Sequence, residues 1–318
     1  MYNHLHPKMK KVYALFLALL NLVWLNPVKA THIAGSDMEF QCMGSDSFKI
    51  TFRIYRDCSP GNAALGSSIP VSFTPVSCNL SPVTTNFNRV GVTPIRFKCN
   101  GLEWASICEG GTFPFGIEEH VFTQTVYLKQ LFPSIDSTCC LIKVGWTSCC
   151  RNGAITNLVN PLIQGFTNEG IINRCITPCN SSPQFTNKPI VAICAGQPYC
   201  YNMGVVDTID FDSLSFDFAD PLGTGGVSVS FANGLSKNQP LNYLGFGFPN
   251  LPFPSGLHLD PQSGDLCFTP MGQQQPVLAI KITEWRKING QYVKIGETRR
   301  DAQFYTWQCL LIILPKLK

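Results

Sequence analysis

The stretch FKITFRIY, residues 48–55, alternates apolar and polar side chains from Phe48 to Ile54. Successive side chains of a β-strand point to opposite faces, so this period of two predicts a strand with one buried face. Residues 38–42 predict a partner strand. Between the two lies Gly-Ser-Asp-Ser at 44–47, where Gly tolerates positive φ and Asp or Ser can hydrogen-bond nearby backbone. The segment therefore predicts a β-hairpin.

Strand-like composition recurs along the rest of the chain. The same pattern predicts strands at residues 122–128, 141–146, 227–231, 265–269 and 277–285. Residues 256–266 predict a further hairpin, with Gly264 in the left-handed position of its turn. No long segment has a 3.6-residue apolar period, and Pro161 limits the best helical candidate, residues 155–160.

These elements predict an all-β protein of two domains. The chain has 26 Gly and 23 Pro among its 318 residues, which suits short strands joined by many turns. Turn-forming residues at 177–189 have the composition of a linker. We therefore expect a cysteine-rich β-sandwich at residues 31–182, a second β-sandwich at residues 183–301 and an atypical tail at residues 302–318.

Residues 1–30 have the layout of a secretory signal peptide. Lysines precede an apolar run at residues 12–24, and Val-Lys-Ala at 28–30 predicts cleavage after Ala30. The run is shorter than the about 20 residues that span a bilayer, so a membrane anchor is the less favoured reading. We expect a secreted or cell-surface protein whose mature chain has no transmembrane span.

The charge balance argues against nucleic-acid binding. The signal peptide holds four of the 24 basic residues and no acidic ones, so the mature chain keeps 20 basic residues against 20 acidic ones. The formal net charge of +4 therefore belongs to the export signal. A surface without a basic cluster offers no attraction for phosphate backbones. Partners are expected among other surface proteins or polysaccharides.

All fifteen cysteines follow residue 30, as expected for a chain that is oxidised after export. Fifteen is odd, so one thiol is left over, and no C-x-x-C spacing of a zinc site occurs. Neighbouring strand residues point apart, so Cys139-Cys140 and Cys149-Cys150 are each expected to bond different elements rather than each other. The disulfide candidates are Cys42, Cys58, Cys78, Cys99, Cys108, Cys139, Cys140, Cys149, Cys150, Cys175, Cys179, Cys194, Cys200 and Cys267.

Several motifs carry a resemblance to a known group of proteins. They are Thr-His-Ile-Ala-Gly at 31–35, Gln-Cys at 41–42, Tyr-Arg-Asp-Cys at 55–58 and Ser-Cys-Cys-Arg-Asn-Gly-Ala-Ile-Thr-Asn at 148–157. With them the chain resembles the N-terminal region of large exported Bacteroidetes surface proteins, many labelled gliding-motility-associated. The resemblance covers most of residues 31–180 and implies a surface location with an adhesive or structural role, without known catalytic residues.

The second half resembles the module that follows in those proteins, a cadherin-like or immunoglobulin-like sandwich. The matching motifs are Asp-Ser-Leu at 212–214, the turn at 256–264 and Arg-Arg-Asp at 299–301. Such proteins commonly continue into repeated modules and a C-terminal sorting domain for type IX secretion. Residues 302–318 lack that continuation and are expected to be a truncated or frame-shifted end.

Asp207, Asp210 and Asp212 form a carboxylate cluster in an expected loop. Hard oxygen donors at short spacing are what calcium coordination requires. In cadherin-like modules the comparable loop alternates Asp with other residues and has a Gly before the last Asp, a pattern that Thr208 and Phe211 break. The cluster predicts a calcium site, with a solvated acidic loop as the alternative; no other cofactor is expected.

Three functions remain open from the sequence. The leading one is a non-catalytic structural or adhesive surface protein, since the chain has no Gly-x-Ser-x-Gly elbow, His-Glu-x-x-His helix, P-loop or dinucleotide fingerprint. The second is a carbohydrate-binding module with aromatic stacking residues, and the third is an extracellular hydrolase with acid-base groups. The residues for these two are Trp104, Trp146, Trp285 and Trp307, and Glu118, Glu119 and His120.

Overall fold

The computed structural model describes residues 32–44, 46–59, 62–99, 102–111, 116–189, 191–245 and 256–308. Side chains at 97–99, 102–104 and 191 lie outside this description. The expected signal peptide, residues 1–30, and the end of the expected tail, residues 309–318, also lie outside the described residues.

Almost all regular structure is β. The strands of the first half are β1 (Ile33–Gly44), β2 (Ser47–Asp57), β3 (Ser68–Pro75), β4 (Val83–Ile95), β5 (Phe97–Cys99), β6 (Leu102–Trp104), β7 (Ile117–Tyr127), β8 (Leu141–Cys149) and β9 (Gly165–Asn173). Those of the second half are β10 (Gln184–Phe185), β11 (Val191–Cys194), β12 (Tyr199–Asn202), β13 (Val205–Val206), β14 (Ser213–Ala219), β15 (His258–Leu259), β16 (Asp265–Phe268), β17 (Val277–Ile288) and β18 (Gln291–Trp307). The helical turns are η2 (Ile107–Glu109), α2 (Leu128–Leu131), η3 (Pro161–Ile163) and η4 (Thr224–Gly226).

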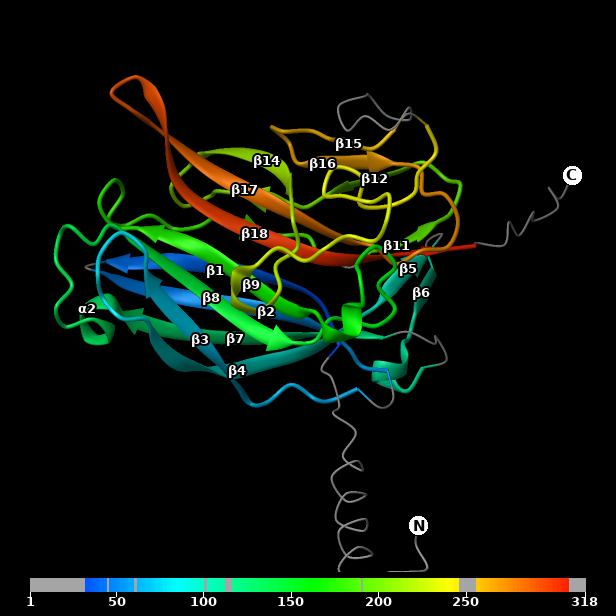
Figure 1. The fold of residues 1–318 in the computed structure, drawn as a ribbon, viewed down its shortest axis with the longest axis horizontal. Coiled ribbons are helices and arrows are strands. Elements are labelled where there is room, and N and C mark those ends of the chain that lie inside the picture. Colours follow the sequence, from blue (N-terminus) through cyan, green and yellow to red (C-terminus); the bar gives the residue numbers. More distant parts are fainter. Residues whose placement is uncertain are drawn as a thin grey trace, which may run out of the picture.

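One long sheet runs through both halves of the chain. Its order is β1-β2-β7-β4-β3-β8-β9-β18-β17-β14, and β18 also pairs with β1 and, in parallel, with β11. Pairing to β9 is at Glu297, and pairing to β1 is at Asp301 and Ala302. In Figure 1, β17 and β18 lie between the first-half strands and the small sheet of β12, β15 and β16. The last strand therefore joins the two halves.

The first core confirms the period-two prediction. Phe48, Ile50, Phe52 and Ile54 of β2 are all buried, and β2 pairs with β1 across the predicted hairpin. They pack with apolar side chains of β3, β7, β8 and β9. The one-sided alternation thus places a single face of each strand toward this core.

A second core lies between strands β14, β17 and β18 of the long sheet and the small sheet of β12, β15 and β16. It contains Phe216 of β14, Ile280 of β17 and Phe304 of β18, with Leu266 and Phe268 of β16 opposite them. The rings of Phe268 and Phe304 meet edge to face with centroids 6.3 Å apart. The all-β class is confirmed, and the predicted strands at 265–269 and 277–285 correspond to β16 and β17.

Two expected elements are wrong. Residues 155–160 form no helix, because the side chain of Asn157 hydrogen-bonds the backbone of Val277 and Pro240 and ties this segment to the second half. Residues 227–231 form only isolated bridges, at Ser228 and Phe231, rather than a strand. At Asn157 and at Phe231, which bridges to Leu158, contacts with distant segments outweigh the local propensity.

The middle of the expected linker is packed rather than exposed. Asn180, Ser181 and Ser182 are buried. The hydroxyls of Ser182 and Ser181 accept hydrogen bonds from the backbone N–H groups of Phe40 (2.8 Å) and Cys42 (3.2 Å) on β1. Polar residues suit this segment because they satisfy backbone groups of a strand that they cover.

Candidate functional site

Three of the motifs, at 55–58, 148–157 and 299–301, converge with Asp37 of β1 on the junction between the two halves. Asp37 of β1 accepts two hydrogen bonds from the guanidinium of Arg300 on β18, at 2.7 and 2.8 Å. The hydroxyl of Tyr55 donates to Asp37 at 2.8 Å, and the Arg300 guanidinium lies 4.2 Å from the ring centre of Phe185. All three polar side chains are buried, and burial raises the pKa of Tyr55 well above its usual value.

A second buried ion pair lies on the opposite face of β18. Asp301 accepts hydrogen bonds from Arg151 at 3.0 and 2.6 Å, and Arg151 also donates to the carbonyl oxygens of Gly165 and Leu222. Adjacent strand residues point to opposite faces, so Arg300 and Asp301 reach different partners. Bidentate pairs of this kind combine strong attraction with fixed geometry.

Two asparagines of the 148–157 motif complete this junction. Asn152 donates to Asp57 at 3.1 Å, and Asn157 donates to the carbonyl oxygens of Val277 and Pro240 while its own oxygen accepts from the Val277 N–H. Each of these three motifs thus supplies a buried polar group whose partner is distant in sequence. The motifs build a junction whose charges are paired internally.

The residues considered for acid-base chemistry lie in ion pairs. Glu118 accepts a hydrogen bond from Arg56, and the Nε2 of buried His120 lies 2.8 Å from the same carboxylate. These two hydrogen bonds lower the pKa of Glu118. Glu119 points to the other face of β7 and pairs with Lys188. The three side chains therefore do not converge on one pocket among the described cavities.

The tryptophans considered for sugar stacking do not form a flat exposed row in the described structure. Trp146 is buried in the first core and packs on Phe166. Trp285 and Trp307 are partly buried, and the Nε1 of Trp285 donates to the hydroxyl of Ser215 at 2.8 Å. The side chain of Trp104 lies outside the described residues.

Most cysteine candidates are paired. The bonds are Cys42–Cys179, Cys58–Cys108, Cys78–Cys139, Cys140–Cys175, Cys149–Cys150 and Cys200–Cys267, and Cys194 is also disulfide-bonded. The side chain of Cys99 lies outside the described residues.

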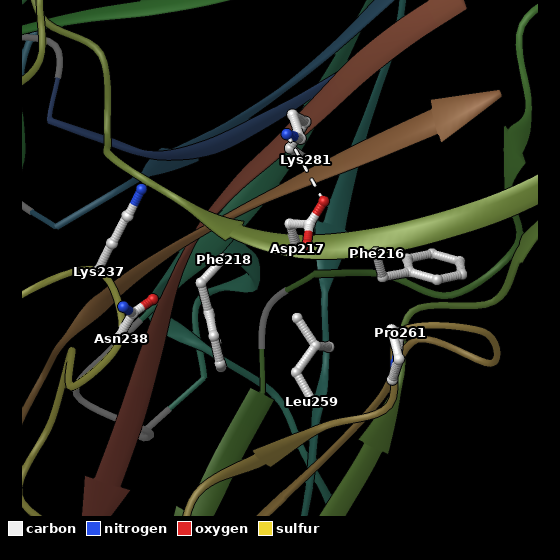
Figure 2. Close-up of a pocket in the computed structure, with 8 residues that line it drawn as sticks. All are labelled: Phe216, Asp217, Phe218, Lys237, Asn238, Leu259, Pro261 and Lys281. Carbon is white, nitrogen blue, oxygen red and sulfur yellow. Dashed lines mark ion pairs between the residues drawn. The ribbon is translucent and has the colours of Figure 1, made fainter. Parts of the chain in front are cut away.

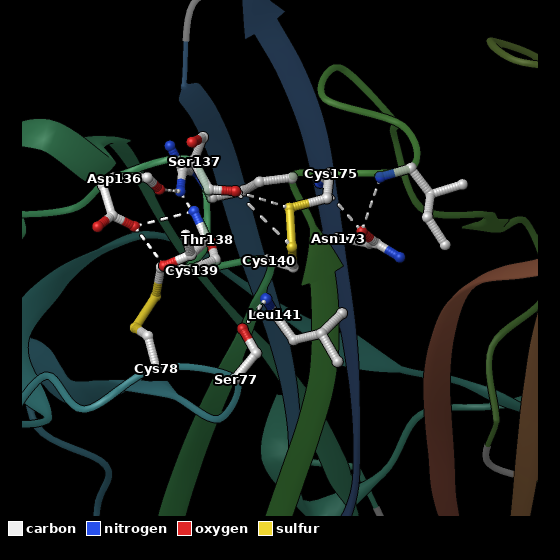
Figure 3. The surroundings of a disulfide bond; sticks show 12 residues. Ser77, Cys78, Asp136, Ser137, Thr138, Cys139, Cys140, Leu141, Asn173 and Cys175 are labelled. Atoms are coloured by element: carbon white, nitrogen blue, oxygen red, sulfur yellow. Dashed lines mark hydrogen bonds between the residues drawn. A yellow bond between two sulfur atoms is a disulfide. The ribbon is translucent and has the colours of Figure 1, made fainter.

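The two adjacent cysteine pairs behave differently. Cys139 and Cys140 bond different elements, as predicted, and Figure 3 shows their two disulfides side by side at the start of β8. The prediction for Cys149 and Cys150 is wrong, because they bond each other. Cys149 ends β8, so strand alternation no longer separates the two side chains.

The structure brings two of the three predicted calcium ligands together with a residue that the sequence did not indicate. Carboxylate oxygens of Asp207, Asp212 and Glu284 lie within 4.8 Å of one another. Asp210 is not one of these three ligands: it accepts a hydrogen bond from the Ser181 N–H at 2.6 Å and lies 3.8 Å from the guanidinium of Arg286. Glu284 follows Ile280 and Ile282 on the buried face of β17, and a carboxylate in such an apolar alternation is the signal that could have found it.

One arginine partly neutralises this acidic cluster. Arg286 donates to both carboxylate oxygens of Asp212, at 2.7 and 2.6 Å, and to the side-chain oxygen of Asn180 at 2.6 Å. The hydrogen bond to Asp212 raises the pKa of Arg286. Burial raises the pKa of Glu284 to about 8, and the three aspartates add to this effect.

The described cavities include an open groove of about 440 Å³ beside β14, drawn in Figure 2. Phe216 and Phe218 of β14 face Leu259 and Pro261, with Lys237 at the other side. Its acidic residue, Asp217, forms an ion pair with Lys281 at 3.5 Å. The groove therefore offers no unpaired carboxylate among its described lining residues.

No protein-family model, curated protein or solved structure matches the chain. Among the described residues, the structure has no helix of the length and apolarity needed to cross a membrane. The disulfides are compatible with an oxidising, extracellular compartment.

Proposed function

We propose that this protein is a secreted or cell-surface structural protein with an adhesive role and without catalysis, of the kind found in Bacteroidetes gliding and attachment. The observation that carries the proposal is the junction, where two buried bidentate arginine–aspartate pairs tie the first half of the chain to β18 of the second half. The buried polar groups of the junction make it rigid, because each of them pairs with another group inside the protein. A rigid exported body suits mechanical contact with other surface proteins or polysaccharide.

The two halves are proposed to be sandwich modules of immunoglobulin-like or cadherin-like type joined into one body. Separate cores in the two halves support this proposal. The disulfides that tie loops to strands add support, since such bonds stabilise exported domains.

The first test is mass spectrometry of the natural protein from cell fractions and culture medium, without reduction. We expect an amino terminus at Thr31, location outside the cell membrane and the cysteine pairs given above. A retained segment 1–30 together with free thiols would overturn both the compartment and the function.

The adhesive role has its own test. Beads coated with the oxidised protein are exposed to polysaccharides and to surface-protein extracts of the source cells. We expect retention on one of these classes, and unchanged retention in Glu118→Gln, because the proposal assigns no chemistry to that carboxylate. Turnover of a glycoside or peptide substrate that Glu118→Gln abolishes would instead establish a hydrolase.

A further inference from the structure

We propose that Asp207, Asp212 and Glu284 bind a calcium ion. One carboxylate oxygen of each residue lies within 4.8 Å of the other two. Calcium takes six to eight oxygen ligands at about 2.3–2.6 Å, so oxygens on opposite sides of the ion lie about 5 Å apart. Three oxygens at the observed spacing can therefore contact one ion together, with water completing the shell.

The burial and hydrogen bonding of Glu284 also point to a ligand, and this evidence does not depend on the acidic loop. Its side chain is 0% exposed, and its Oε1 has no hydrogen-bond partner in the described structure. Its Oε2 accepts a hydrogen bond from Asn180 at 2.7 Å. An unpartnered carboxylate oxygen is costly to bury, and a cation coordinated there would satisfy it.

The charge balance also favours a cation. Asp207, Asp210 and Asp212 share the single guanidinium of Arg286, and Glu284 adds a fourth carboxyl group beside the three aspartates. Repulsion from the three aspartates adds to burial in holding Glu284 protonated, and a divalent ion offsets that repulsion and favours the ionised carboxylate. Oxygen-only donors select calcium or magnesium over zinc or copper, and calcium, unlike magnesium, tolerates an irregular ligand shell of the kind that a loop and a strand would form together.

The loop is already shaped to present these groups. Asp207 accepts hydrogen bonds from the backbone N–H groups of Ile209, Asp210, Phe211 and Asp212, at 2.9–3.2 Å. These bonds fold residues 207–212 around the Asp207 carboxylate and bring Asp212 back beside it. An ion held there would cross-link this loop to β17.

Isothermal titration of the oxidised full chain with calcium chloride tests the site. We expect one ion per chain, with an affinity in the range of about 10⁻⁴ to 10⁻³ M known for extracellular modules. Glu284→Gln keeps the shape of the side chain and removes its charge, and should weaken binding by more than about tenfold, since ligand charge sets affinity. Asp217→Asn is the control, because Asp217 lies on β14 and pairs with Lys281 away from the cluster.

Proteolysis gives a second readout. Phe211 lies in the loop and is 81% exposed, so it offers a chymotrypsin site. Calcium should slow cleavage after Phe211 in the natural protein and leave cleavage of Glu284→Gln unchanged. Should Glu284→Gln fail to fold, Asp207→Asn replaces it with the same expectations.

Absence of heat with calcium, equal binding by Glu284→Gln, or tighter binding of magnesium than of calcium would each overturn the proposal. None of these results bears on secretion or adhesion, because the calcium site and the proposed function rest on different residues.

Discussion

Gly35 lies where β1 passes close to the backbone of β18. A Cβ atom there would lie 2.5 Å from the backbone oxygen of Asp301. We expect Gly35→Ala to lower the free energy of unfolding by about 1–3 kcal/mol, because backbone must move to admit the methyl group. Chemical denaturation measures the loss. Gly91→Ala is the matched control, since its Cβ would meet nothing within 4 Å, and equal losses in both variants would contradict the argument.

Removing one partner of the buried Asp37–Arg300 pair is expected to be strongly destabilising. Arg300→Met should cost about 3–5 kcal/mol of unfolding free energy, because it leaves the buried carboxylate of Asp37 without its partner. Arg96→Met, which removes the exposed partner of Glu109, should cost at most about 1 kcal/mol. Equilibrium unfolding of both variants compares the two, and similar costs would argue against a fully desolvated pair.

Buried Tyr201 provides a pH-dependent prediction. Its hydroxyl donates to the carbonyl oxygen of Lys188, and burial raises its pKa from 10.0 to about 12. The folded state therefore favours the neutral phenol, so this contribution is complete below about pH 10 and is lost as the pH rises toward about 12. Unfolding free energies measured from pH 9 upward should fall more steeply for the natural protein than for Tyr201→Phe. Parallel slopes would show that Tyr201 ionises alike in both states.

At the scale of elements, the disulfides differ in the length of chain that they close. Cys42–Cys179 spans 137 residues and Cys140–Cys175 spans 35. In the chain-entropy account, the longer loop should stabilise by about 1 kcal/mol more. Replacing each pair by serines and comparing denaturation midpoints tests this order. A larger loss from the shorter loop would mean that native contacts, rather than entropy of the unfolded chain, dominate.

The elements also show how far sequence patterns reach. The hairpin of β1 and β2 follows from local alternation and turn chemistry, and Gly264 takes the positive φ of 74° that its turn predicted. The helix expected at residues 155–160 is absent because Asn157 bonds to Val277, 120 residues away. Local patterns carry no information on such a partner.

At the scale of the whole molecule, the junction predicts cooperative unfolding. Residues 31–182 alone would leave Asp37 and Arg151 without Arg300 and Asp301. We expect this fragment to show poor NMR dispersion and to bind hydrophobic dyes, whereas coexpression with residues 183–318 restores a folded complex. Two separate thermal transitions in the natural protein, with a well-dispersed spectrum of the fragment, would contradict this expectation.

The acidic cluster illustrates the division between sequence and structure. The sequence predicted a site of Asp207, Asp210 and Asp212 in one loop. The structure instead groups Asp207 and Asp212 with Glu284 of β17. This grouping depends on the pairing of β14 with β17, which sets the loop at Asp212 beside the end of β17. No spacing within the loop could have indicated it.

The sequence by itself determined the all-β class, the first hairpin, the strands at 265–269 and 277–285 and the divergence of Cys139 and Cys140, because alternation and turn chemistry act between near neighbours. Only the tertiary structure decided that β18 joins both halves, that Arg300 and Asp301 take partners on opposite faces, and that Glu284 meets the acidic loop. These contacts join residues tens to hundreds of positions apart, and their choice depends on the pairing order of strands, which burial of the whole chain selects.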